Sequence, residues 1–220
     1  DGVNTATSNT LLVSTSGKYN VVTTDGNGCV SDTSSPVYVT VNPLPNASIT
    51  PSGATTFCSG GSVTLSNNNG ISYVWNESGT PIGGAINNNY VASTSGSYTV
   101  TVTDNKGCSA TTSTPTVVVV DAATIAGTVT GGSNVCQGST SGTLTLSGQA
   151  GNVQKWQFAL APFTLWTDIS NTNTTYTSGA LSATTAFRAV VKNGTCLAVE
   201  ADSTVVTITP SSVGGTVSGG

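Results

Sequence analysis

Two segments of the chain have nearly the same sixteen residues. Ser14 to Cys29 reads STSGKYNVVTTDGNGC, and Ser93 to Cys108, 79 positions later, reads STSGSYTVTVTDNKGC. The same shift places Pro36 on Pro115. Repeats of this length are whole small domains rather than single turns of a solenoid, so the chain is predicted to be a series of tandem domains.

The repeat divides the chain into four parts. Near the C-terminus, VGGTVSGG (Val213 to Gly220) is similar to IAGTVTGG (Ile125 to Gly132), so a further unit is expected to begin there. The first residues match the middle of a unit, so the sequence is interpreted as a segment of a longer series of repeats. The expected parts are the C-terminal half of a truncated repeat (1–43), a complete repeat (44–121), a complete divergent repeat (122–210) and the start of a further repeat (211–220).

Alternation of apolar and polar residues predicts β-strands throughout the complete units. Tyr98, Val100 and Val102 share one face of a strand, and the threonines between them share the other. This pattern is typical of an antiparallel sheet with one solvated face, and no 3.6-residue period favours a helix. The fold class is therefore predicted to be all-β, as tandem immunoglobulin-like antiparallel β-sandwiches arranged like beads on a string.

Aromatic residues recur at equivalent places in the units. Trp75 and Trp156 each lie in a short strand and are expected in the two cores. Tyr19 in SGKY and Tyr98 in SGSY match a tyrosine corner, in which the hydroxyl bonds back to the backbone. The alternative is an ordinary core tyrosine with an exposed hydroxyl. The divergent unit has Phe187 at this position and must do without that bond.

The five cysteines form an odd number that the repeat can explain. Each complete unit contains two, so the predicted disulfides are Cys58–Cys108 and Cys136–Cys196, with the partner of Cys29 outside the fragment. A metal site is the weaker alternative, because there is no CxxC pair and no histidine. Disulfides imply an oxidising compartment, and hence a secreted or cell-surface protein.

The landmarks together resemble a known class of repeats. CSGGSVTL, YVW, STSGSYTVTVTDNKGC and VNPLP are similar to Ig-like tandem repeats of giant Bacteroidetes surface proteins of the gliding-motility adhesin type. The second pattern, from GTVTGGSNVC to VVKNGTC, resembles another repeat type of the same proteins. The resemblance implies secretion, display at the cell surface and a role in adhesion or in an extracellular filament.

Composition excludes several classes of function. Only 6% of residues are charged, the net charge is −4, and the five lysines and arginines are scattered, which argues against a nucleic-acid partner. No apolar run is long enough for membrane insertion. Without histidine no Ser–His–Asp arrangement is possible, and no other catalytic cluster is present, so neither an enzyme nor a cofactor is expected.

Three residues are candidates for ligand contact. Asp25 and Asp104 lie in equivalent turns, DGNG and DNKG, where aspartate suits the turn geometry. Weak calcium binding is the functional alternative for these two carboxylates. Trp166 has no counterpart in the first repeat type and is a possible contact for a sugar, although it could instead pack under a loop.

The sequence favours a structural and adhesive repeat region of a large bacterial cell-surface or extracellular fibre, which holds adhesive sites away from the cell. The alternatives are spacer or glycan-binding modules of a large secreted enzyme, and a subunit of a self-assembling filament. The expected partners are neighbouring repeats, and further candidates are surface polysaccharides, abiotic surfaces and other copies of the chain.

Overall fold

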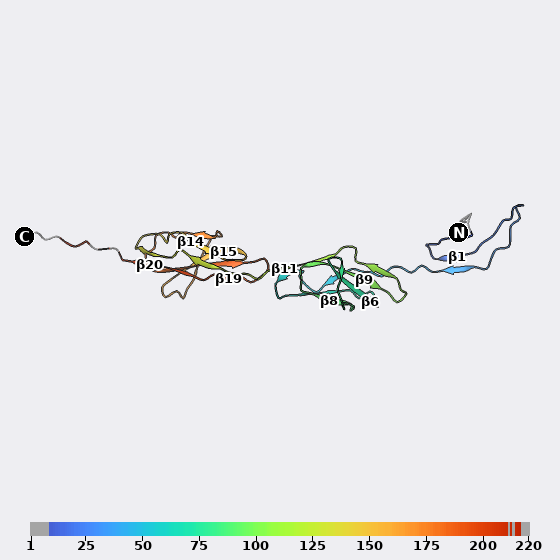
Figure 1. Cartoon of the computed structure of the whole chain (residues 1–220), viewed down its shortest axis with the longest axis horizontal. Coiled ribbons are helices and arrows are strands. Elements are labelled where there is room, and N and C mark those ends of the chain that lie inside the picture. The colour runs from blue at the N-terminus through green and yellow to red at the C-terminus, as the bar shows by residue number, and fades with distance from the viewer. Residues whose placement is uncertain (1–8, 211, 213, 217–220) are drawn as a thin grey trace, which may run out of the picture.

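A computed structural model describes residues 9–210, 212 and 214–216. We name residues 1–43 the first unit, 44–121 the second unit and 122–210 the third unit. Figure 1 shows the second and third units end to end, with the first unit continuing the line beyond the second. The expected start of a further repeat, 211–220, lies mostly outside the described residues.

The second unit is a sandwich of two sheets. One sheet has the order β3-β5-β8, and the other has the order β4-β11-β9-β6-β7, with β10 paired to β9. All pairs are antiparallel except β4 with β11. The strands are β3 (Thr50–Pro51), β4 (Thr56–Cys58), β5 (Val63–Ser66), β6 (Ser72–Glu77), β7 (Thr80–Pro81), β8 (Asn89–Ala92), β9 (Gly96–Thr103), β10 (Ser109–Thr111) and β11 (Thr116–Asp121).

The third unit repeats this topology. Its sheets have the orders β12-β14-β17 and β13-β20-β18-β15-β16, with β19 paired to β18, and β13 is again parallel to β20. The strands are β12 (Thr128–Thr130), β13 (Asn134–Cys136), β14 (Leu144–Ser147), β15 (Asn152–Leu160), β16 (Thr167–Ile169), β17 (Thr175–Tyr176), β18 (Thr185–Lys192), β19 (Val199–Glu200) and β20 (Thr204–Thr209).

Alternation along β9 separates core from surface as the sequence predicts. Tyr98, Val100 and Val102 are fully buried. The threonines face outward, where Thr101 pairs with the Thr111 hydroxyl at 2.8 Å. The all-β prediction is therefore confirmed, because apolar residues at every second position line the space between two sheets.

Each core is built around one tryptophan. Trp75 and Trp156 are both fully buried. Each indole N–H donates at 2.9 Å to a backbone carbonyl in a loop, that of Asn87 before β8 in the second unit and that of Asn173 before β17 in the third. An aromatic chain continues from each indole, through Tyr90 and Tyr98 or through Tyr176 and Phe187. The two units thus share a core despite their different sequences.

A tyrosine hydroxyl is tied to the backbone four residues earlier in both repeats of the first type. The Tyr98 hydroxyl lies 3.0 Å from the Thr94 carbonyl oxygen, and the Tyr19 hydroxyl lies 2.9 Å from that of Thr15. This is the geometry of a tyrosine corner. Burial raises the pKa of Tyr98, so the hydroxyl stays protonated and donates.

The first unit forms one antiparallel pair of strands, β1 (Gly17–Tyr19) and β2 (Val37–Val39). Its apolar residues are exposed where their equivalents are buried. Val21 is 60% exposed, whereas Val100, 79 positions later, is fully buried. The described part of this unit therefore lacks the opposing sheet that buries the same face in the second unit.

Candidate functional site

A disulfide joins the second unit to the third. Cys58, at the end of β4, is bonded to Cys196, in the turn after β18, with the two Cα atoms 4.7 Å apart and 138 positions between them in sequence. The predicted disulfides Cys58–Cys108 and Cys136–Cys196 are therefore wrong, and Cys108 and Cys136 are free. The bond links neighbouring sandwiches instead of the two sheets of one sandwich.

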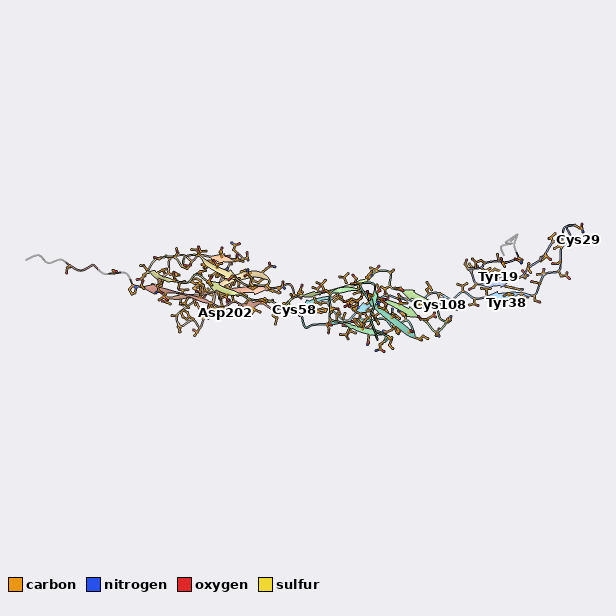
Figure 2. The ribbon with its side chains drawn as sticks, viewed as in Figure 1. Tyr19, Cys29, Tyr38, Cys58, Cys108 and Asp202 are labelled. Carbon is orange, nitrogen blue, oxygen red and sulfur yellow. A yellow bond between two sulfur atoms is a disulfide. The ribbon has the colours of Figure 1, made fainter. Side chains whose placement is uncertain are left out.

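The register of the strands explains why Cys58 cannot reach Cys108. Parallel pairing of β4 with β11 places Cys58 beside Asp121, the last residue of β11. Since β11 runs antiparallel to β9, Asp121 extends past Gly96, the first residue of β9. Cys108 follows the opposite end of β9. Since β9 has eight residues, the two cysteines are separated by a strand length of about 25 Å. Figure 2 shows Cys58 at the end of the second unit near the third, and Cys108 at the other end.

The third unit separates its two cysteines in the same way. Cys136 pairs with Thr209, the last residue of β20. Thr209 extends past Thr185, the first residue of the antiparallel strand β18. Cys196 follows the opposite end of β18. Each complete unit thus carries a head cysteine (Cys58 or Cys136) beside the end of its last strand and a turn cysteine (Cys108 or Cys196) at the opposite end of the unit.

Hydrogen bonds reinforce the disulfide. The linker 122–124 leaves β11 and passes the turn that follows β18. The Asn193 side-chain amide donates to the Ala122 carbonyl at 2.8 Å, and the Asn193 backbone N–H donates to the Thr124 hydroxyl at 3.0 Å. That hydroxyl donates in turn to the Leu197 carbonyl at 2.8 Å. The linker is therefore held against the third unit along its length. We name Asp121, the linker, the turn 193–197 and the disulfide the junction clasp.

Asp121 supplies the negative charge of the junction clasp. One carboxylate oxygen, Oδ2, accepts hydrogen bonds from the Thr195 backbone N–H at 2.7 Å and from the Thr195 hydroxyl at 2.8 Å. These bonds favour the ionised form, so they lower the pKa of Asp121 below its ordinary value. The Asp121 carbonyl also accepts from Ser59 N–H at 2.8 Å, which ties the same residue to the strand of Cys58.

Gly194 lets the turn approach the carboxylate. Its φ is 48°, and a Cβ built on it would overlap the side chain of Asp121. Any other residue there would push the turn away from the linker. Glycine is thus required both by the backbone conformation and by the close approach of the second unit.

The remaining cysteines lie at the ends of units. Cys29 and Cys136 are exposed, and Cys108 is half-buried. The expectation that Cys29 has its partner outside the fragment stays a prediction. Figure 2 places Cys29 at the end of the first unit that points away from the second.

Asp25 and Asp104 stabilise their own turns. In each, Oδ1 accepts two backbone N–H groups at 2.9 Å, from Asn27 and Cys29 in the first unit and from Lys106 and Cys108 in the second. Within the described residues no group of three His, Cys, Asp or Glu side chains is arranged to hold a metal ion. The two carboxylates therefore have a structural role in the turn.

Trp166 lies over a polar network on the outer face of the third unit. The Arg188 guanidinium carbon is 4.1 Å from the centre of its indole ring, so one face of the ring is covered. Arg188 Nε donates a hydrogen bond to Gln157 Oε1, and the Gln157 amide N–H donates to the Asp168 carboxylate. This carboxylate also forms an ion pair with Lys155 at 2.7 Å. The Gln157 and Lys155 hydrogen bonds lower the pKa of Asp168. Any stacking ligand would be restricted to the other face of the indole.

A cavity of about 250 Å³ opens in the third unit. Its wall supplies hydroxyl groups and apolar side chains but no carboxylate, thiol or ammonium group, and burial raises the pKa of its Tyr176. Such a wall offers no acid–base pair for catalysis. It is lined by Phe158, Leu160, Ile169, Tyr176, Ser178, Gly179, Ala180, Leu181, Ser182, Ala183, Thr185 and Phe187.

Sequence reasoning missed the junction clasp. Asp121, Asn193 and Thr195 come from two units, and only the strand registers bring them together. The one available signal was the short connection 122–124, because three residues between the end of β11 and the bridge at Ile125 leave little room between the sandwiches. No helix in the described part of the chain is long and apolar enough to cross a membrane.

Comparison with known proteins supports the fold. A family model for a domain of unknown function (DUF8696) matches residues 125–212, which include most of the third unit. Domains I67–I69 of titin, in a Glu-to-Ala variant, are 12% identical, with 77% of this chain and 67% of that chain covered and a TM-score of 0.52. The chain is therefore a tandem array of immunoglobulin-like sandwiches.

Two bacterial structures are more distantly similar. A 1.5-MDa bacterial ice-binding adhesin is 17% identical over 87% of this chain and 74% of that chain, with a TM-score of 0.42. A Ca²⁺-stabilised, ice-binding adhesin of an Antarctic bacterium is 17% identical over 92% and 59%, with a TM-score of 0.40. No curated protein sequence matches the chain.

Proposed function

We propose that this chain is a non-catalytic, load-bearing repeat region of a large bacterial cell-surface or extracellular fibre. The observation that carries the proposal is the Cys58–Cys196 disulfide between neighbouring sandwiches. A covalent bond at this place joins two sandwiches, so it limits how far the two units can bend or separate.

The junction clasp supports a fixed relation between the units. A three-residue linker alone would leave the second and third units free to rotate about its backbone bonds. Here Asp121, Ala122 and Thr124 are each hydrogen-bonded to the turn that carries Cys196. A protein that holds adhesive sites away from a cell needs this stiffness.

The same bond supports an extracellular location. Disulfides persist in oxidising environments such as the cell surface and the secreted space. The resemblance to giant Bacteroidetes surface repeats extends the proposal to adhesins of the gliding-motility type. The low charge of the surface suits contact with varied substrata, because such contact is little affected by salt.

Stretching a single molecule by its two ends tests the load-bearing role. With the disulfide intact, tension passes from Cys58 to Cys196 through the sulfur atoms, so the residues between them remain unextended. A reductant is expected to release about 480 Å of additional contour length, from 138 residue steps of about 3.5 Å. The Cys136→Ser variant is the matched control and should behave like the wild type. Equal extension with and without reductant would contradict the proposal.

Binding of a polysaccharide is a second candidate function, favoured by the half-buried Trp166 beside Arg188. Aromatic rings that lie beside hydrogen-bonding groups suit sugars, which have both apolar faces and hydroxyls. The test is retention of the chain on a polysaccharide panel and on bare glass and polystyrene. Saturable retention that Trp166→Ala abolishes would support recognition here. Retention that Trp166→Ala leaves unchanged would exclude Trp166 as the contact.

A further inference from the structure

We infer that the Cys58–Cys196 bond is one instance of a rule that operates along the whole fibre: the head cysteine of each unit is bonded to the turn cysteine of the following unit. Cys136 then bonds to the turn cysteine of a unit after the third. Cys108 and Cys29 bond to the head cysteines of the units that precede theirs. The inference rests on the proposed function as an array of such units.

The two head cysteines occupy equivalent positions. Each ends a short strand that runs parallel to the last strand of its unit, with Cys58 aligned with Asp121 and Cys136 with Thr209. The residue after each cysteine donates to the carbonyl of the aligned residue, Ser59 at 2.8 Å and Gln137 at 3.1 Å. The next turn is also shared, because the Cys58 and Cys136 carbonyls accept from the N–H three residues later at 2.9 and 3.0 Å.

This equivalence places the Cys136 sulfur where a following unit would begin. Cys58 and Asp121 lie side by side at the exit of the second unit, and the turn of the third unit reaches that exit. Cys136 and Thr209 lie side by side at the exit of the third unit in the same way. Cys136 is exposed and forms no disulfide in this chain.

The turn cysteines are also equivalent. Cys108 and Cys196 follow the eight-residue strands β9 and β18, and Cys29 lies at the place of Cys108 in the sequence repeat. Cys29 and Cys108 also share a turn with the same three bonds. In both turns the aspartate N–H donates to the cysteine carbonyl at 2.9 Å, and the aspartate carbonyl accepts from the glycine N–H at 3.1 Å. The aspartate side-chain Oδ1 accepts from the cysteine N–H at 2.9 Å. The turn of Cys196 is built differently, because the Cys196 N–H donates at 2.9 Å to the backbone carbonyl of Asn193, three residues earlier.

Redox chemistry favours the same assignment. An environment that oxidises Cys58 and Cys196 also acts on the exposed thiols of Cys29 and Cys136. A disulfide-carrying oxidoreductase is the oxidant. The Cys136 thiolate attacks its disulfide to form a mixed disulfide, and the partner thiolate then attacks the Cys136 sulfur and expels the carrier thiolate. One S–S bond forms in the fibre, one breaks in the carrier, and the two protons end on the two carrier thiols.

The natural full-length protein provides the test. It is isolated with free thiols alkylated, and is then digested without reduction by a protease that cuts before aspartate. The aspartates of this chain separate all five cysteines into different peptides, which are 25–31, 32–103, 104–120, 121–167 and 168–201. The expected result is that peptide 32–103 is linked to 168–201, while 121–167 and 104–120 are each linked to a cysteine peptide of another unit.

Two results would overturn the inference. One is alkylated Cys136 or Cys108, and the other is a link between 121–167 and 168–201 or between 32–103 and 104–120. The Cys136→Ser variant of the full-length protein is the positive check, because it should expose one newly alkylated turn cysteine in the following unit and leave Cys58–Cys196 intact. Failure of the proposed function appears separately, as a reductant-independent extension under force.

Discussion

Asp121 and Thr195 meet across the boundary between two sandwiches. The carboxylate of the last residue of β11 receives both the backbone N–H and the hydroxyl of Thr195, at 2.7 and 2.8 Å. The two residues are 74 positions apart in sequence. A charged hydrogen bond that depends on both units reports directly on whether the junction is closed.

Acid is expected to weaken the junction. Because the pKa of Asp121 is lower in the folded protein, its carboxylate stabilises the closed junction fully above the ordinary aspartate pKa of about 3.9. That contribution is lost as the pH falls through the folded pKa. Melting temperatures measured from pH 7 to pH 2.5 should therefore differ between wild type and Asp121→Asn at neutral pH and converge in acid. The pKa of Asp168 is also lowered, but its titration affects the wild type and the variant equally and cancels in the difference between their melting temperatures. A difference that stays constant with pH would contradict this role.

Replacing Gly194 with alanine is expected to slow formation of the disulfide. The added Cβ overlaps the Asp121 carboxylate, so the turn that carries Cys196 must move away from Cys58. The measurement is the rate at which the Cys58–Cys196 peptide link forms from reduced protein in a glutathione buffer. Gly107→Ala is the matched control. It also has a positive φ, of 80°, but its Cβ meets nothing within 4 Å. Equal rates for the two variants would exclude the steric explanation.

Removing the disulfide is expected to uncouple the two sandwiches. The Cys58→Ser, Cys196→Ser double variant lacks a closed loop of 138 residue steps, which stabilises by up to about 5 kcal/mol in the chain-entropy model. Calorimetry should resolve two transitions at lower temperature where the wild type gives one. Cys136→Ser should retain the wild-type trace, since Cys136 is free in this chain. A double variant that melts like the wild type would contradict coupling through sulfur.

The hydroxyl of Tyr98 is expected to stabilise the second unit only. Tyr98→Phe removes the bond to the Thr94 carbonyl, worth about 1 kcal/mol, and should lower the melting temperature of that unit by about 4–8 °C. Tyr90→Phe is the control, because this hydroxyl belongs to the same aromatic chain but forms no hydrogen bond within the described residues. The variants are compared in the Cys58→Ser, Cys196→Ser background, in which the two units melt in separate transitions. The transition of the third unit, with Phe187 at the equivalent position, should be unchanged. An equal decrease in melting temperature for Tyr98→Phe and Tyr90→Phe would show that the hydrogen bond of the tyrosine corner does not stabilise the unit.

Most of the architecture could be predicted from the sequence because local chemistry determines it. The alternation at Tyr98, Val100 and Val102 identifies a core strand, and the recurrence of Trp75 as Trp156 identifies the centre of each sandwich. The alternation lies within a few residues and the recurrence lies in matching repeats of the sequence, so no knowledge of the tertiary structure is needed to read either signal.

The cysteine pairing could not be predicted from the same kind of signal. Spacing shows that Cys58 and Cys108 flank a unit, but not that they lie at its opposite ends. That depends on the parallel pairing of Cys58 with Asp121, which the short strand β4 makes with β11 across a long interval of sequence. The assumption that the two cysteines of one unit pair with each other led to the wrong partner.

The disulfide also changes what proteolysis can do to this protein. Residues 59 to 195 lie between the two bonded cysteines, so cleavage of any single peptide bond among them leaves both fragments attached through sulfur. A host or environmental protease that nicks an exposed loop would therefore not release the distal part of the molecule. Shedding would require either reduction of the bond or a cut outside the loop that it closes.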